Sequence, residues 1–172
     1  MKITIGQINT TNGDIAGNVA QILYAIAQGK KDGADIVVTP EVAIQGYTSF
    51  DWFMDKDVAR ASLDYLPEII AATQGITAIV GTVRPNDSGQ GRRLYNSAAV
   101  IHDGQLLGFA DKLLLPEYDV FDDPRYFEPG CERRVFIVNG RKLGVVVCED
   151  FWNDKTYWRE RLYQNVCAER HH

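Results

Sequence analysis

The chain has 172 residues, of which 45 % are hydrophobic and 24 % charged, and its net charge at pH 7 is −5. These values are typical of one ordinary globular domain, and an acidic chain without a basic run is not expected to bind nucleic acid. No apolar stretch approaches the roughly 18 residues that a membrane helix needs, and the N-terminus has no long apolar segment of the signal-peptide type. We therefore expect no signal peptide and no membrane partner.

Strand and helix patterns alternate in the first half of the chain. Short apolar β patterns occupy residues 3–9, 34–41 and 75–83. Apolar residues at helical spacing occupy residues 18–31 and 55–73. A loop rich in aromatic residues, GYTSFDWF, lies between the β pattern at 34–41 and the helical pattern at 55–73. This alternation is typical of an α/β domain.

The second half of the chain is dominated by hairpin patterns. Residues 94–112 predict two strands that turn at Asp-Gly, and residues 133–150 predict two more that turn at Asn-Gly, with the last strand running to the cysteine of GVVVC. Residues 113–131 contain three prolines and many acids and predict a long irregular loop. After Trp152 the pattern is polar and predicts a helix. Together the elements predict one α/β domain with mixed β-sheets.

The cysteine and histidine content limits the possible chemistry. Three cysteines without CxxC spacing do not predict a disulfide framework or a zinc site, and they fit a reducing cytoplasm. No Cys–His–Asn or Ser–His–Asp set is readable. If a cysteine is the nucleophile, we expect its base not to be a histidine. The cysteines are Cys131, Cys148 and Cys167, and the histidines are His102, His171 and His172.

Three reactive side chains stand where predicted strands end: Glu41, Lys112 and Cys148. Ligands of layered α/β proteins commonly bind beyond strand ends, where loops converge. A carboxylate that accepts the thiol proton, an ammonium that stabilises an oxyanion and a thiol nucleophile form a set capable of acyl transfer. Each residue also has a purely structural interpretation. The cysteine fits core packing, the glutamate a solvated cap and the lysine a surface charge.

The sequence segments around these three residues resemble the motifs of a known family. PEVAIQGY, DKLLLPEYDVFDDPRYFEPG and GVVVCEDFW resemble, in order and spacing, the glutamate, lysine and cysteine motifs of the nitrilase (carbon–nitrogen hydrolase) superfamily. The resemblance implies an αββα sandwich with mixed sheets. It also implies that Glu41 is the general base, Lys112 the transition-state stabiliser and Cys148 the nucleophile of an amide hydrolase.

Within the superfamily, LPEYDVFDDPRYF and CEDFWND look most like the glutaminase domains of glutamine-dependent NAD⁺ synthetases. The resemblance implies L-glutamine as substrate, with Tyr47, Tyr118, Glu149 and Trp152 in its pocket. The carboxylate of Glu149 would pair with the glutamine α-ammonium. It further implies a partner synthetase domain in the same polypeptide, which uses ATP and Mg²⁺ to amidate nicotinic acid adenine dinucleotide.

Two departures from the family pattern leave questions open. Many superfamily members carry an extra glutamate after the lysine, and the acids nearest here are Glu117, Asp119, Asp122 and Asp123. The chain is also shorter than a complete domain, so residues 1–172 are expected to be one carbon–nitrogen hydrolase domain that is incomplete at its C-terminus. A cut sheet favours self-association, and we expect a homo-oligomer.

No synthetase domain is expected in the chain, because its one Gly-rich stretch, SGQGRR, lies between β patterns and does not match an ATP-pyrophosphatase loop. We therefore expect no cofactor and no metal in this chain. Two alternatives to a glutaminase remain. The chain could be another amidase or carbamoylase of the superfamily, or a catalytically inactive fragment that serves only as a structural or interaction piece.

Overall fold

The computed structural model describes residues 1–154, 156–160 and 162–163, so Cys167, His171 and His172 lie outside the described residues. The strands are β1 (Ile3–Ile5), β2 (Ile36–Val38), β3 (Thr77–Pro85), β4 (Leu94–His102), β5 (Gln105–Asp111), β6 (Val135–Val138) and β7 (Arg141–Gly144). The α-helices are α1 (Ile15–Lys31), α2 (Lys56–Ala72) and α3 (Asp123–Tyr126). Two 3₁₀ helices span Tyr47–Met54 and Cys148–Phe151.

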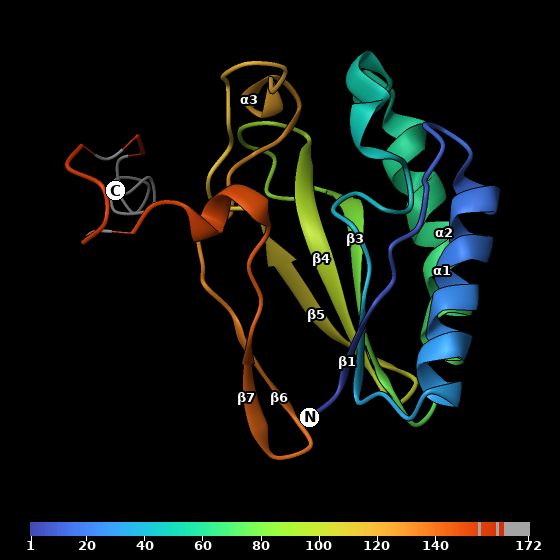
Figure 1. The fold of residues 1–172 in the computed structure, drawn as a ribbon. Coiled ribbons are helices and arrows are strands. Elements are labelled where there is room, and N and C mark those ends of the chain that lie inside the picture. Colours follow the sequence, from blue (N-terminus) through green and yellow to red (C-terminus); the bar gives the residue numbers. More distant parts are fainter. Residues whose placement is uncertain (155, 161, 164–172) are drawn as a thin grey trace.

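Five strands form one mixed sheet in the order β1-β2-β3-β4-β5. The pairs β1–β2 and β2–β3 are parallel, and the pairs β3–β4 and β4–β5 are antiparallel. The predicted α/β class with a mixed sheet is therefore confirmed. Because β2 and β5 run in the same direction, both end at the same edge of the sheet, and the loops that follow them meet there (Figure 1).

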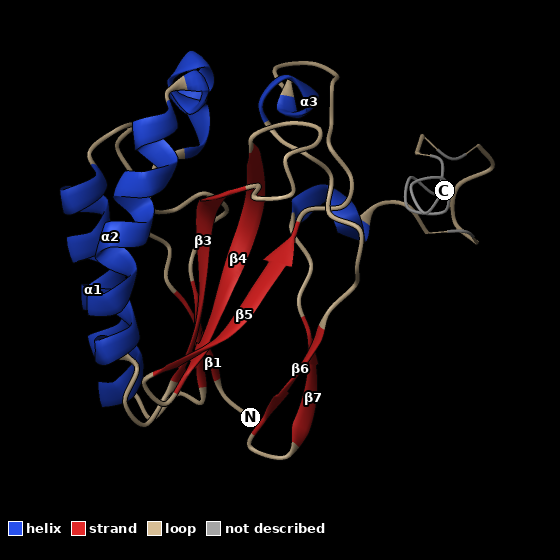
Figure 2. Ribbon diagram, turned by 180° about the vertical axis from the view of Figure 1, so that it is seen from behind, coloured by secondary structure: helices blue, strands red, loops and turns tan. Residues whose placement is uncertain are grey.

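The sheet lies between two layers. Helices α1 and α2 cover one face, and the separate β6–β7 hairpin lies against the other (Figure 2). Strand β4 packs against both the helices and the hairpin, because successive side chains of a strand point to opposite faces of the sheet. Ala99 and Ile101 belong to the core under the helices, whereas Ala98 and Val100 pack with Phe136 of the hairpin. An outer helix layer beyond the hairpin, which an αββα sandwich would have, is absent from the described residues.

Local sequence explains where several elements begin and end. The Asp14 carboxylate caps α1 by accepting a hydrogen bond from the Gly17 N–H at 3.0 Å. The β4–β5 turn places Asp103 and Gly104 at φ values of 46° and 74°, as a type I′ hairpin requires. The β6–β7 turn repeats this arrangement at Asn139-Gly140. Both predicted hairpins are therefore present. Within the described residues, none of the helices has the length and apolar character needed to cross a membrane.

Four local predictions differ from the structure. The last strand ends at Gly144 rather than at Cys148, because its partner β6 begins at Val135 and no strand among the described residues is paired with the residues that follow. The helix predicted after Trp152 is wrong for the described residues, where Asp154 instead bonds the N–H groups of Thr156 and Tyr157 and holds a turn. The aromatic loop is largely a 3₁₀ helix, and the loop at 113–131 contains α3.

Candidate active site

Glu41 lies just beyond β2, in a loop that crosses β3 at very close range. A Cβ atom placed on Gly81 of β3 would lie 2.1 Å from the Pro40 carbonyl oxygen and 2.6 Å from the Val42 nitrogen. Val42 itself has φ 50°, a conformation that β-branched residues rarely adopt. Its side chain is fully buried, so packing holds the strained backbone in place. The loop is thus fixed against the sheet, and it carries a carboxylate with 17 % exposure.

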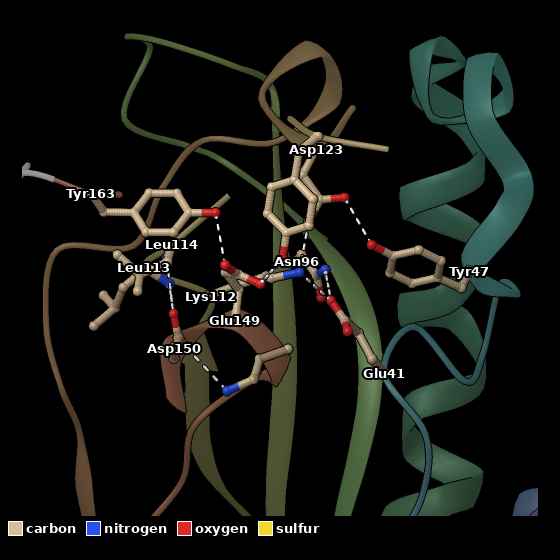
Figure 3. Close-up of polar contacts among 12 residues, drawn as sticks. Glu41, Tyr47, Asn96, Lys112, Leu113, Leu114, Asp123, Glu149, Asp150 and Tyr163 are labelled. Atoms are coloured by element: carbon tan, nitrogen blue, oxygen red, sulfur yellow. Dashed lines mark hydrogen bonds and ion pairs between the residues drawn. The ribbon is translucent and has the colours of Figure 1, made fainter. Parts of the chain in front are cut away.

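Lys112, directly after β5, is completely buried with its ammonium between two carboxylates (Figure 3). Its Nζ lies 2.7 Å from Glu41 Oε1 and 2.7 Å from Asp123 Oδ2. Burial alone would lower the pKa of Lys112, but the charges of Glu41 and Asp123 outweigh it and raise the pKa above its ordinary value. The interpretation of Lys112 as a surface charge is therefore wrong.

Asp123 is the acid of the 113–131 loop that the fold brings to the site. It is buried, and besides Lys112 it accepts a hydrogen bond from the Tyr47 hydroxyl at 3.1 Å. Burial, together with the neighbouring charges of Asp123 and Glu41, raises the pKa of Tyr47. The sequence offered four acids in this loop without distinguishing them. Glu117, Asp119 and Asp122 are exposed, so only the fold separates Asp123 from them.

Cys148 is the first residue of a 3₁₀ helix, and its backbone has φ 45°. A non-glycine residue in this left-handed region is uncommon and indicates a sharp turn. The turn leaves the thiol exposed, and Cys148 and Glu41 line the same hollow. Partial desolvation by the surrounding protein and the charge of Glu41 raise the pKa of the Cys148 thiol, while Lys112 acts in the opposite direction. The exposed position does not fit the alternative of a buried packing residue.

Asp150 joins the cysteine turn to the lysine loop. Its Oδ1 accepts hydrogen bonds from the N–H groups of Leu113 and Leu114, both at 2.8 Å. Its Oδ2 accepts from the N–H of Val147 at 3.1 Å. One side chain thus ties together the residues that follow Lys112 and the residue that precedes Cys148 (Figure 3). Sequence reasoning missed this role, because it depends on backbone donors that no motif reveals.

The predicted substrate residues fall into two groups. Tyr118, Glu149 and Trp152 line one pocket of ≈ 510 Å³. Glu149 is only 5 % exposed, and its two oxygens accept hydrogen bonds from Tyr118 at 2.8 Å and from Tyr163 at 3.0 Å. Tyr163 was not foreseen, because no pattern distinguishes it from other tyrosines.

Tyr47 lies apart from this pocket. It contacts Asp123, and the centre of its ring is 5.9 Å from Lys112 Nζ. Its contact with substrate stays a prediction. A second hollow of ≈ 290 Å³ is bounded by Glu41 and Cys148. In the part of the chain that the structure describes, no group of three or more His, Cys, Asp or Glu side chains is arranged to hold a metal ion.

The pattern of the Carbon-nitrogen hydrolase family matches residues 2–162. The chain therefore belongs to the carbon–nitrogen hydrolase family, and the predicted superfamily is confirmed.

Among individual proteins, the chain is 39 % identical over 168 residues to a glutamine-dependent NAD⁺ synthetase of Synechocystis sp., a match that covers 94 % of this chain and 30 % of that protein. The solved structure of the glutamine-dependent NAD⁺ synthetase from Acinetobacter baumannii superposes with a TM-score of 0.79 at 34 % identity, covering 87 % of this chain and 28 % of that one. The chain thus spans less than a third of the length of these relatives.

An amidase from Nesterenkonia sp. superposes with a TM-score of 0.72 at 24 % identity over 87 % of this chain and 56 % of that one, which shows a shared fold. The nitrilase-like fold class predicted from the sequence is confirmed by these superpositions. The superpositions show this fold class even though the described residues lack one outer helix layer.

Proposed function

We propose that this chain is the glutamine amidohydrolase part of a glutamine-dependent NAD⁺ synthetase. The observation that carries the proposal is the meeting of Glu41, Lys112 and Cys148 at one edge of the sheet, where Lys112 binds Glu41 and where Glu41 and Cys148 line one hollow. The neighbouring pocket contains a buried carboxylate. The relatives that are 39 % and 34 % identical to this chain are named as glutamine-dependent synthetases, which favours glutamine over other amides.

The proposed reaction begins with transfer of the Cys148 proton to Glu41. The thiolate attacks the side-chain amide carbon of glutamine, and the Lys112 ammonium and the backbone N–H of Glu149 stabilise the oxyanion. Glu41 returns the proton to the departing ammonia, which leaves a thioester on Cys148. Water, deprotonated by Glu41, hydrolyses the thioester and releases glutamate and the free thiol.

The same proposal assigns the chain a partner. A synthetase domain would receive the ammonia and would bind ATP and Mg²⁺ to amidate nicotinic acid adenine dinucleotide. In the structure, the Gly-rich residues SGQGRR form the loop between β3 and β4. A cytoplasmic location and a homo-oligomeric state belong to the proposal as well.

Release of glutamate and ammonia from L-glutamine by the purified chain tests the proposal. Wild-type turnover should disappear in Cys148→Ala and persist in Cys131→Ala, which removes an exposed cysteine outside the site. Turnover that survives in Cys148→Ala would contradict the proposed nucleophile. A wild-type chain that hydrolyses another amide but not glutamine would contradict the proposed substrate.

A further inference from the structure

Asn96 lies on β4 and contacts the loops that carry both Glu41 and Lys112. Its side-chain Nδ2 donates a hydrogen bond to Glu41 Oε1 at 2.6 Å, and its backbone carbonyl accepts one from the Lys112 N–H at 2.8 Å. The residue is 1 % exposed. A single buried residue of the central sheet thus touches two of the three proposed catalytic residues (Figure 3).

Only the nitrogen of the Asn96 side-chain amide forms a hydrogen bond within the described residues. Among the described residues, its Oδ1 is a buried side-chain oxygen without a hydrogen-bond partner. Leaving a buried acceptor unpaired costs stability, so an amide is a poor choice for packing alone. The opposite orientation of the amide would point Oδ1 at the Glu41 carboxylate, acceptor against acceptor. The charge of Glu41 therefore fixes the orientation, and the useful part of the side chain is its N–H donor.

Asn96 and Lys112 donate to the same oxygen of the Glu41 carboxylate. Glu41 Oε1 accepts from both Asn96 Nδ2 at 2.6 Å and Lys112 Nζ at 2.7 Å. An oxygen that accepts two hydrogen bonds, one of them from a cation, binds a proton less readily than its neighbour. The second oxygen, Oε2, has neither of these donors.

We propose that Asn96 is a positioning residue that occupies Glu41 Oε1 and thereby makes Oε2 the oxygen that exchanges a proton with Cys148. The inference rests on the proposed function, because it assigns a role within that reaction. Asn96 acts through Glu41 and does not itself touch the reacting atoms.

The substitution Asn96→Leu removes the donor and keeps the side chain close in size. The titratable groups around Glu41 are Lys112, Asp123, the Cys148 thiol and the Tyr47 hydroxyl. The substitution leaves all of them in place. The charge of Glu41 raises the pKa of the Cys148 thiol, and a Glu41 carboxylate that has lost its Asn96 donor should raise it further. The limb of the kcat/KM profile for glutamine that reports the thiol should therefore move to higher pH, and kcat should fall about tenfold to a hundredfold with KM nearly constant.

Asn18→Leu is the matched control. Asn18 is also a fully buried asparagine, but it is fully bonded, with its Oδ1 accepting from Thr11 N and its Nδ2 donating to the carbonyls of Thr11 and Ile44. Its replacement should lower the melting temperature and leave the pH profile unchanged. Asn96→Leu should instead move the pH profile, while its two effects on stability oppose each other, because it removes an unpaired acceptor and also a hydrogen bond to Glu41. Loss of activity in Asn96→Leu together with a lower melting temperature and an unchanged pH profile would overturn the proposal.

A second measurement needs no substrate. The rate of Cys148 alkylation by iodoacetamide, followed by mass spectrometry of its peptide, reports the thiolate population against pH. With the Asn96 donor gone, the Glu41 charge acts more strongly on the thiol, so the midpoint should move up in Asn96→Leu and stay in place in Asn18→Leu. An unmoved midpoint in Asn96→Leu would overturn the positioning role even if the chain hydrolysed no glutamine, whereas a shifted midpoint without glutamine turnover would contradict only the proposed substrate.

Discussion

Asp123 accepts a hydrogen bond from the Lys112 ammonium at 2.7 Å, and both side chains are buried. The ammonium also binds Glu41, so one positive charge lies between two negative ones. Breaking a buried ion pair by removing one partner is costly, because the remaining charge loses compensation in a region of low dielectric. Asp123 therefore stabilises Lys112 in its charged form, the form that an oxyanion requires.

The substitution Asp123→Asn should lower the free energy of unfolding by about 1.5–3 kcal/mol, the range for hydrogen bonds to charged groups. It should also lower the pKa of Lys112, since the Asp123 charge helps to raise it. A raised amine pKa stabilises the fold below the unfolded-state pKa, and this contribution is lost as pH rises through the folded-state pKa. The stability deficit, measured by urea unfolding, should be complete at neutral pH and shrink in strong alkali.

Asp119→Asn provides the comparison for this experiment. Asp119 is an exposed acid of the same loop with φ 54°, a conformation that asparagine also tolerates. Its substitution should leave both stability and its pH dependence unchanged. Equal deficits in the two variants would show that loop composition, rather than the buried ion pair, is responsible.

Glu41, Lys112 and Cys148 could be selected from the sequence because each follows a recognisable β pattern and lies within a family motif. Asp123 could not, since four acids share the loop and only the burial that follows folding distinguishes them. Asn96 and Asp150 were also missed. Their roles depend on contacts with distant residues, which local spacing does not encode: Asn96 bonds Glu41, 55 positions away, and Asp150 bonds Leu113, 37 positions away.

The same distinction holds for the fold. The two hairpins were predictable because Asp103-Gly104 and Asn139-Gly140 determine a tight turn locally. The end of β7 was not, because GVVV has high β propensity, yet the strand ends at Gly144, where its pairing with β6 ends and no other described strand continues it. Propensity is local, whereas strand pairing depends on the position of a distant segment.

The charges beside Cys148 predict opposite pKa shifts in two variants. Glu41 raises the pKa of the thiol and Lys112 lowers it. Glu41→Gln should therefore move the midpoint of Cys148 alkylation by iodoacetamide to lower pH, and Lys112→Met should move it to higher pH. Glutamine turnover should be lost in both, because one lacks the base and the other the oxyanion stabiliser.

Cys131 serves as an internal reference in the alkylation experiment. It is exposed and lies outside the site, so the pH dependence of its alkylation should be the same in wild type and both variants. Shifts of the same sign at Cys148 in the two variants would contradict the electrostatic assignment. Parallel shifts at Cys131 would point to a general disturbance of the fold.

Gly81 is predicted to be essential to the position of Glu41. An alanine methyl group there would lie 2.1 Å from the Pro40 carbonyl oxygen and 2.9 Å from the Glu41 carbonyl carbon, and backbone atoms cannot rotate away as a side chain can. Gly81→Ala should therefore destabilise the fold by about 1–3 kcal/mol and reduce kcat for glutamine. Gly144→Ala is the control, because nothing lies within 4 Å of its added methyl group. Normal turnover in Gly81→Ala would show that the loop has room to adjust.

Glu149 is predicted to recognise the α-ammonium of glutamine. Each of its oxygens accepts one tyrosine hydroxyl, and a carboxylate oxygen has two acceptor sites, so one site on each oxygen is left for the ligand. Glu149→Gln keeps the size but removes the charge, and KM for glutamine should rise about tenfold or more with kcat little changed. N-acetylglutamine has no ammonium, so wild type should hydrolyse it poorly and the variant should lose this discrimination. If the variant still prefers glutamine to the acetylated compound as strongly as wild type does, another group binds the ammonium.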